Sequence, residues 1–306
     1  MNKFILWLLP ISFLLLMAAC GNNEQHEDGK MVIYTTVYPL QYFAERIGGE
    51  DTIAKSVYPP GSDEHTFEPS QKDMMNLADA DLFLYIGYDL EGFAKKAETT
   101  LKNEHVKMEA VGEKISLEHD EDEHNDHDGH DHGGINPHLW IDPIYAKEMA
   151  EQILNNLVEL QPDQKVKFEK NYQELAEELD SLNEDFIKMA ESSKRKEFVV
   201  AHAAYSYWET RYGLEQIAIA GISSSEEPSQ KKLQEIVETI NEKNIPYILV
   251  EQNINSRLAG VLQKESNTNI LHIHNLAVLT DDDIKNNETY FSLMKKNINT
   301  LQEALN

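Results

Sequence analysis

Histidines in three separate segments of the chain have the surroundings expected of metal ligands. His65 lies in the segment 61–69, which follows a strand-like run and two prolines. His138 follows Pro137, which fixes the backbone before it, and precedes an apolar stretch. His202 ends an apolar run, at the carboxyl end of a predicted strand. Because ligands of open α/β sheets bind at that end of the strands, the three imidazoles could converge on one divalent ion in a cleft.

Spacing alone does not select these three histidines. His272 and His274 share one face of another predicted strand, at positions i and i+2. A single loop histidine such as His65 is more often a surface residue, and His202 could be a satisfied core side chain. These alternatives stay open on the residues alone.

A second group of histidines lies in the segment 118–132, which has five His, eight acidic residues and no Lys or Arg. Without apolar residues the segment cannot compensate the entropy of ordering, so we expect a mobile loop. Imidazoles and carboxylates both bind Zn²⁺, Cu²⁺ and Ni²⁺, so we expect weak, auxiliary metal capture near a tighter site. The alternative is a solvated acidic loop without a role. The histidines concerned are His119, His124, His127, His130 and His132.

The composition restricts the classes of function. The 306 residues carry a formal net charge of −27, which argues against nucleic acid as a partner and permits cations. A single Cys excludes a disulfide framework or a site of several thiolates within the chain. The length suggests about two domains, and 41% hydrophobic residues can form real cores.

The amino-terminal residues indicate export. Residues 1–19 have a charged start, an apolar run at 4–17 and then small residues, which is typical of a signal peptide. That run is shorter than the roughly 20 residues that span a bilayer. Cys20 ends a segment that resembles a bacterial lipobox, so we expect it to be acylated. Polar residues at 20–30 then form a tether, and the protein is predicted to be lipid-anchored on the extracytoplasmic face of the cell membrane.

Alternating strand-like and helical patterns predict an α/β protein with two mainly parallel sheets. An amino-terminal lobe is predicted at 31–160, with the histidine-rich loop at 118–134, and a carboxyl-terminal lobe at 193–306. The predicted strands are 32–37, 53–58, 82–87 and 106–111 in the first lobe, and 198–203, 215–220, 246–252 and 269–274 in the second.

A long helix is predicted at 161–192, between the two lobes. Its apolar residues are spaced four and three apart, with Glu and Lys on the other faces. One helix limits hinging more than two flexible strands would, so we expect a stiff two-lobed molecule with a cleft. The spaced residues are Phe168, Tyr172, Leu175, Leu179, Leu182, Phe186 and Met189.

With these segments in view, the chain resembles the solute-binding lipoproteins of ABC transporters that import zinc or manganese. The resemblance is carried by YPPGSDEHTFEPS at 58–70, NPHLWIDP at 136–143, AHAAYSY at 201–207 and the long helix. It implies a metal site between the lobes, with His65, His138 and His202 as ligands. The fourth ligand of the family is an acid before an aromatic pair and a helix, which here matches Glu288.

Other acids could compete with Glu288 for the fourth position, although exposed loop charges are their more ordinary interpretation. They are Glu251, Asp281, Asp282 and Asp283. Three imidazoles and one carboxylate suit tetrahedral Zn²⁺, whereas Mn²⁺ prefers more oxygen ligands. The resemblance therefore implies a monomeric receptor that binds Zn²⁺ and delivers it to an ABC permease and its ATPase subunit.

Three other kinds of function remain as alternatives. The chain could be a manganese or other divalent-metal receptor of the same family. It could also be a zinc-dependent hydrolase, with Glu64 beside His65 as general base, but no HExxH spacing is present and we expect no enzymatic activity. An adhesin or a metal buffer based on the histidine-rich loop alone is a third possibility.

Overall fold

The first four strands form one parallel sheet in a computed structural model, which describes residues 29–117, 135–253 and 257–306. The strands β1 (Met31–Thr35), β2 (Thr52–Ser56), β3 (Leu82–Tyr85) and β4 (Lys107–Ala110) lie in the order β2-β1-β3-β4. Met31 pairs with Thr52, and Ile33 with Leu82. We call this sheet and its helices the N-lobe.

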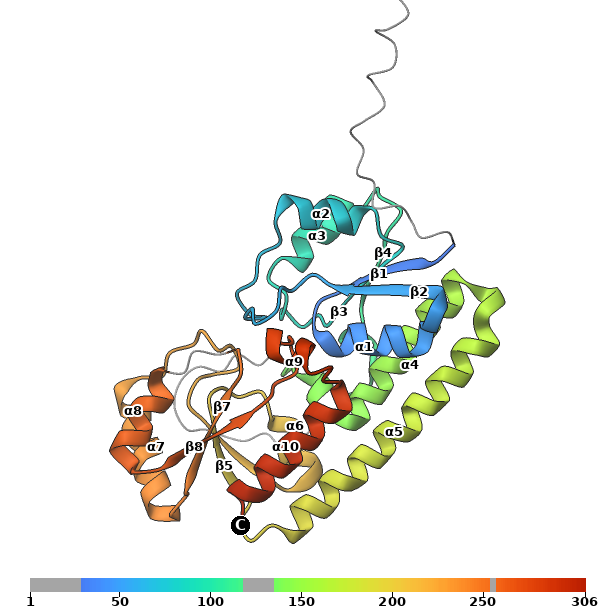
Figure 1. Cartoon of the computed structure of the whole chain (residues 1–306). Coiled ribbons are helices and arrows are strands. Elements are labelled where there is room, and N and C mark those ends of the chain that lie inside the picture. The colour runs from blue at the N-terminus through green and yellow to red at the C-terminus, as the bar shows by residue number, and fades with distance from the viewer. Residues whose placement is uncertain (1–28, 118–134, 254–256) are drawn as a thin grey trace, which may run out of the picture. The chain divides into compact units, whose positions relative to one another are not determined.

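Helices cover both faces of the N-lobe sheet (Figure 1). On one face lie α1 (Tyr38–Gly48) and α4 (Pro143–Leu160), and on the other lie α2 (Gln71–Ala78) and α3 (Ala94–Leu101). Their ends follow from local chemistry. Ser70 and Asp73 form a capping box at α2, and the buried Asp142 side chain caps α4.

The next four strands form a second parallel sheet with the equivalent order, β6-β5-β7-β8. They are β5 (Glu197–Val200), β6 (Glu215–Ala218), β7 (Tyr247–Glu251) and β8 (Asn269–Ile273). The helices of this C-lobe are α6 (Ser206–Tyr212), α7 (Gln230–Lys243), α8 (Arg257–Ser266), α9 (Asp281–Lys285) and α10 (Tyr290–Ala304). Because β5 ends at Val200, His202 follows the strand instead of lying within the predicted 198–203.

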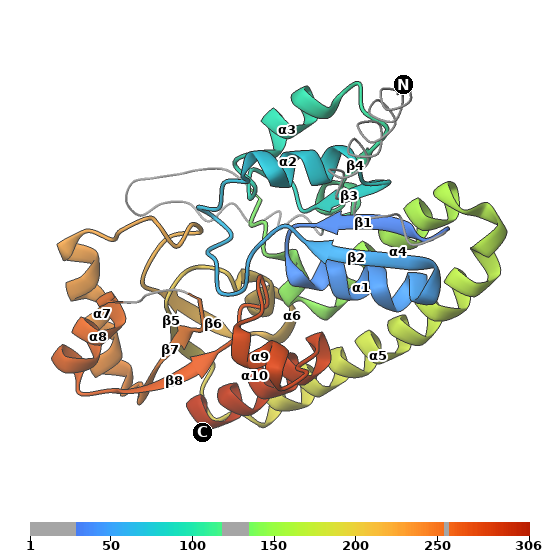
Figure 2. The ribbon, with the colours of Figure 1, turned by 45° about the horizontal axis from the view of Figure 1, so that its top comes forward.

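A single helix, α5 (Lys165–Ser192), runs along both lobes (Figures 1 and 2). A short 3-10 turn at Pro162–Gln164 precedes it. Its apolar stripe is buried from Phe168 to Met189, as the spacing predicts, although Tyr172 is only half-buried. None of the helices in the described ranges has the length and apolar character needed to cross a bilayer.

Polar contacts fix α5 to each lobe in turn. Glu178 pairs with Arg46 of α1 at 2.5 Å, and Asp180 pairs with Lys147 of α4 at 2.6 Å. Further along, Asn183 accepts a hydrogen bond of 2.9 Å from the Tyr212 hydroxyl of the C-lobe. The two-lobed α/β fold with one connecting helix is therefore confirmed.

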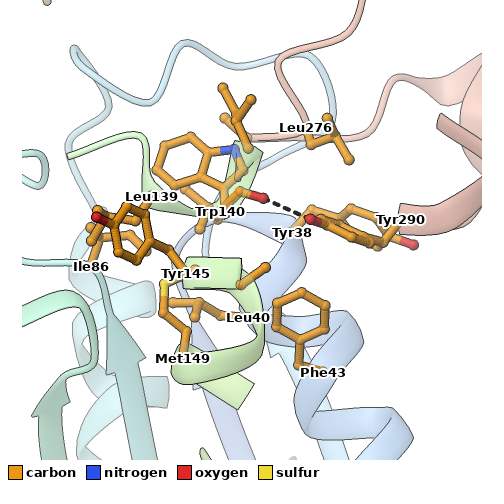
Figure 3. Close-up of a cluster of buried hydrophobic side chains, with 14 of the residues drawn as sticks. Tyr38, Leu40, Phe43, Ile86, Leu139, Trp140, Tyr145, Met149, Leu276 and Tyr290 are labelled. Atoms are coloured by element: carbon orange, nitrogen blue, oxygen red, sulfur yellow. Dashed lines mark hydrogen bonds between the residues drawn. The ribbon is translucent and has the colours of Figure 1, made fainter. Parts of the chain in front are cut away.

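One hydrophobic core extends from the N-lobe through α4 and α5 to the inner face of the C-lobe sheet. Trp140 lies where the lobes meet, between Leu40 of α1 and Leu276 and Tyr290 of the C-lobe (Figure 3). A second, smaller core, which includes Ile236 and Leu262, lies under α7 and α8. The lobes are thus packed together around Trp140, while α7 and α8 form an outer layer.

Candidate metal centre

The segment between β2 and α2 presents two adjacent candidate ligands, Glu64 and His65. Gly61 turns this segment with a φ of 72°, which favours glycine. The backbone N–H of His65 donates to Oδ1 of Asp63 at 2.9 Å, and the Tyr58 hydroxyl donates to the carbonyl of Glu64 at 3.4 Å. The loop is therefore held from within by its own residues.

His138 is oriented by an asparagine two residues before it. Oδ1 of Asn136 accepts from the backbone N–H of His138 at 3.1 Å and lies 2.6 Å from its Nδ1. The Asn136 amide in turn donates to the carbonyl of Ala203 and to Oγ of Ser206, each at 2.8 Å. With a proton on Nδ1, His138 directs the lone pair of Nε2 away from Asn136.

His202 is oriented by a carboxylate at the end of the neighbouring strand. Nδ1 of His202 lies 2.8 Å from Oε1 of Glu251, the last residue of β7, and both side chains are fully buried. A carboxylate that accepts from the distal nitrogen is the usual partner of a metal-binding histidine. Nε2 of His202 is therefore free to face the same point as His138.

The three imidazoles and Glu64 converge between the lobes. Nε2 of His138 lies 3.2 Å from Nε2 of His65 and 3.2 Å from Nε2 of His202. One ligand atom from each of the four residues lies within 4.8 Å of all the others. A tetrahedral ion with bonds of about 2.0–2.1 Å separates two ligand nitrogens by about 3.3–3.4 Å, which fits this arrangement.

Burial controls the protonation of these groups. Burial and the nearby His202 lower the pKa of His65 to about 4, and burial holds the pKa of His138 well below its usual value. Burial would also lower the pKa of His202, but the charge and hydrogen bond of Glu251 outweigh it and raise that pKa. Burial raises the pKa of Glu64 to about 7.

Two amides from the C-lobe bind the Glu64 carboxylate. Nδ2 of Asn253 donates to Oε2 at 2.8 Å, and Nδ2 of Asn275 donates to Oε1 at 3.0 Å. Asn275 also donates to Oε2 of Glu251 at 3.1 Å. In the described part of the chain, the side chains that bind these two buried carboxylates are amides and an imidazole. A divalent ion would supply positive charge where the fold has concentrated acceptors.

The segment that carries His138 leads into α4 of the N-lobe and is bound by several side chains of the C-lobe. The Trp208 indole donates to the carbonyl of Ile141 at 3.1 Å, and Arg211 forms an ion pair with the buried Asp142. The Tyr290 hydroxyl donates to the carbonyl of Trp140 at 2.8 Å. His138 therefore lies on a segment that contacts both lobes, whereas His65 comes from the N-lobe and His202 from the C-lobe.

The structure does not bring Glu288 into the group of four. Its Oε1 pairs with Lys296 at 2.5 Å, and its Oε2 accepts from Oγ of Ser292 at 2.7 Å. These contacts lower the pKa of its carboxyl. The residue lies at a groove with Tyr42 and Glu45 of α1, and in the described part of the chain the acid that lies with the three histidines is Glu64.

The other candidates lie apart from the group. Nε2 of His274 lies 3.2 Å from Oδ2 of Asp283, and His272 is exposed, as are Asp281 and Asp282. Cys20 and the histidine-rich segment, with the rest of 1–28 and 118–134, lie outside the described residues.

The sequence interpretation missed the residues that support the ligands. Glu64 was considered only as a general base, although its place beside His65 in one turn was a signal. Asn136, two residues before His138, matches the short-range pattern of an asparagine that binds nearby backbone. Asn253 and Asn275 gave no signal, because their partners are distant in the sequence.

Two parallel-sheet lobes joined by one helix, with a candidate ligand group drawn from both, are typical of the solute-binding class. The chain belongs to the family "zinc-uptake complex component A, periplasmic", which matches residues 33–304. This confirms the resemblance inferred from the motifs. The family consists of solute-binding proteins, not enzymes.

Individual relatives agree with this membership. The zinc-binding lipoprotein AdcA of Streptococcus pneumoniae is 36% identical over 309 residues, which cover 99% of this chain and 61% of AdcA. The chain thus spans about three-fifths of the length of this relative. The high-affinity zinc uptake system protein ZnuA of Bacillus subtilis is 31% identical over 300 residues, covering 95% of this chain and 94% of ZnuA.

A solved structure has the same fold. The crystal structure of the Zn(II)-bound ZnuA-like domain of Streptococcus pneumoniae AdcA matches with a TM-score of 0.76 and 33% identity. The match covers 90% of this chain and 99% of that domain.

Proposed function

We propose that this protein is an extracytoplasmic receptor that binds Zn²⁺ between its lobes and delivers it to an ABC permease. The observation that carries the proposal is the convergence of three Nε2 atoms, with two neighbouring pairs at 3.2 Å, beside a buried carboxylate. The names of the relatives, which are zinc-binding and zinc-uptake proteins, support the same cargo.

The donor set favours zinc over manganese. Three imidazoles and one carboxylate match the nitrogen-rich, four-coordinate shell of Zn²⁺. Mn²⁺ prefers more oxygen ligands and binds most weakly of the first-row divalent ions to a given site. We therefore expect Zn²⁺ to displace Mn²⁺ at equal concentration, and expect Cu²⁺ or Ni²⁺ to bind when offered.

We propose His65, His138 and His202 as three ligands and Glu64 as the fourth. Glu64 is supported by its place in the group, and Glu288, the position implied by the resemblance, is engaged with Lys296 and Ser292. Glu64→Ala should weaken zinc binding strongly, while Glu288→Ala, as the matched control, should change it little. The reverse result would assign the fourth position to Glu288.

We further propose that Cys20 carries the lipid that anchors the protein to the outer face of the membrane. The lipoprotein name of the streptococcal relative supports an anchor, and the lipobox-like residues before Cys20 place it. Labelling cells with a radioactive or clickable fatty acid tests this. Cys20→Ser should abolish incorporation and release the protein into the medium.

The central test is metal analysis of the purified single variants His65→Ala, His138→Ala and His202→Ala. Each should lose tight, stoichiometric zinc that survives dialysis against a weak chelator. His274→Ala is the matched control, since His274 is also buried and paired with a carboxylate but lies outside the group. Zinc retained by all three variants would contradict the proposed centre.

The histidine-rich loop is proposed as an auxiliary site. Deleting residues 118–134 should remove weakly bound metal and leave one tight zinc per chain. If tight binding vanishes with the loop, the assignment of the tight site to the lobes is wrong.

A further inference from the structure

Asn275 occupies the point at which the two lobes and the candidate ligands meet. It follows β8 by two residues and is fully buried. Its Oδ1 accepts from the Gln252 amide at 2.8 Å and from the backbone N–H of Ala277 at 3.1 Å. Its backbone carbonyl accepts from the Trp140 indole at 2.7 Å. Because Oδ1 and the backbone are held by these donors, the NH₂ group of Asn275 has a fixed direction.

That NH₂ group is directed at the acidic residues of the centre. Nδ2 lies 3.0 Å from Oε1 of Glu64, 3.1 Å from Oε2 of Glu251 and 3.0 Å from Oδ1 of Asn253. An asparagine amide has two N–H donors, so three acceptors share two hydrogens. The NH₂ group therefore cannot donate a full hydrogen bond to each of the three acceptors at the same time.

The two carboxylates that Asn275 binds have different places in the candidate centre. Glu64 comes from the N-lobe and lies among the candidate ligands, whereas Glu251 comes from the C-lobe and orients His202. We propose that Asn275 is a positioning residue that sets the geometry of the centre, by holding a ligand of one lobe and the partner of a ligand of the other lobe with a single amide. This inference rests on the proposed zinc centre.

Other C-lobe residues bind the segment that carries Glu64, but they do not link Glu64 to Glu251. Nδ2 of Asn253 donates to the carbonyl of Ser62 at 3.1 Å, and Oγ of Ser224 donates to Oδ2 of Asp63 at 2.8 Å. Among the described residues, it is Asn275 whose side chain contacts both Glu64 and Glu251. Its loss should therefore change the coordination geometry as well as the affinity.

The test compares Asn275→Ala with Asn297→Ala in the full chain. Asn297 is a matched control, because it is equally buried and binds the backbone of His274, the residue before Asn275, at 2.8 and 2.7 Å without contacting the centre. Zinc affinity is measured by chelator competition. Asn275→Ala should bind zinc about 10- to 100-fold more weakly, as for other residues that orient ligands, and Asn297→Ala should stay within about twofold of wild type.

Cobalt(II) substitution supplies a readout that a loss of stability alone would not change. The visible bands of bound Co²⁺ report the ligand geometry, so they should shift in Asn275→Ala and remain as in wild type in Asn297→Ala. Should Asn275→Ala fail to fold, Asn275→Ser is used, since a single short hydroxyl cannot reach both carboxylates. The serine variant should also show a shifted spectrum and weaker binding.

A double-mutant cycle completes the test. In a Glu64→Ala background, Asn275→Ala should weaken zinc binding less than in wild type, because one of the two carboxylates is already absent. Equal losses in both backgrounds, or wild-type affinity and an unchanged Co²⁺ spectrum in Asn275→Ala, would overturn the role of Asn275 while leaving the zinc centre intact. Failure of the wild-type protein to bind zinc tightly would instead overturn the proposed function.

Discussion

The contact between the lobes has a polar half and an apolar half, and two residues that are only two positions apart in the sequence belong to different halves. The rings of His138 and Trp140 lie 5.2 Å apart, yet His138 belongs to a polar half and Trp140 to an apolar half. The polar half consists of Glu64, His65, His138 and His202, with Glu251 and Asn275 behind them. The apolar half consists of Phe43, Trp140, Leu276 and Tyr290 (Figure 3).

The apolar half joins the lobes irrespective of any ligand. Trp140 and Tyr290 are fully buried, and the Tyr290 ring packs edge-on against Phe43 of α1 at 5.0 Å. Burial of apolar surface stabilises without a directional partner, at roughly 25 cal/mol per Å². This half therefore holds the fold together in the presence and absence of metal.

The polar half has the opposite energetics. It buries two carboxylates and the imidazoles of His138 and His202, and half-buries that of His65, and burying such groups costs free energy that hydrogen bonds from amides offset only in part. The proposed divalent ion would compensate this cost, so we infer that the polar half serves metal binding and not the stability of the fold. Substitutions in the two halves should consequently have separable effects on stability and on zinc affinity.

The largest effect on stability is expected for Trp140→Ala. Removing a fully buried indole should lower the free energy of unfolding by about 3–5 kcal/mol, since it leaves a cavity and frees the carbonyl of Asn275. Urea unfolding of the metal-free protein measures this. A loss below about 1 kcal/mol would show that the lobes are not joined through the apolar half.

The next effect is expected on affinity, for Glu251→Gln. The neutral amide is a weaker acceptor for Nδ1 of His202, so zinc should bind about 10- to 100-fold more weakly. The stability of the metal-free protein should change less than the zinc affinity does, because removal of a buried charge offsets the loss of one of the two hydrogen bonds that Glu251 accepts. Competition with a chelator and urea unfolding are run on the same samples. A loss of stability with unchanged zinc affinity would contradict the claim that the polar half controls affinity and the apolar half controls stability.

A smaller change is expected for Tyr290→Phe in the apolar half. The variant keeps the packing but leaves the carbonyl of Trp140 without its donor, which should cost about 1–3 kcal/mol of stability. Zinc affinity should stay within about threefold of wild type. A tenfold loss of affinity here would mean that the two halves are coupled and not separable.

The smallest effect on stability is expected for Asp283→Asn. Asp283 pairs with His274 and lies outside the polar half. The hydrogen bond from His274 holds the pKa of Asp283 below its usual value, so the folded state binds fewer protons in acid than the unfolded state. The stabilisation is present above about pH 4 and is lost as the pH falls further. The difference in unfolding free energy between wild type and variant should therefore shrink from pH 7 to pH 3.5.

Zinc affinity at pH 7 is the control for this variant and should not change. If the difference in unfolding free energy between wild type and variant grows toward pH 3.5, the ionised carboxylate of Asp283 does not stabilise the folded protein.

The fold was predictable because its elements depend on local patterns. The spacing of apolar residues from Phe168 to Met189 predicted α5, and alternating strands and helices predicted both sheets. Strand ends were less well defined: β5 ends at Val200, before the predicted limit of 203, because the chain leaves the sheet ahead of His202.

The candidate centre was predictable only in part. His65, His138 and His202 each stand in a distinctive segment, and the structure brings them together. Asn275 could not be found, because its contacts with Glu64 and Trp140 arise only when segments more than a hundred residues apart pack together. Glu288 stood in a matching motif, but a motif does not reveal that Lys296, two turns along α10, would take its carboxylate.

The most direct test of the proposed zinc centre is the position of the metal in a crystal of the zinc-loaded protein, located by anomalous scattering at the zinc edge. We predict one strong peak between the lobes, about 2.0–2.2 Å from Nε2 of His65, His138 and His202 and from a carboxylate oxygen of Glu64. A single zinc found elsewhere on the chain, with these imidazoles outside its coordination sphere, would contradict it.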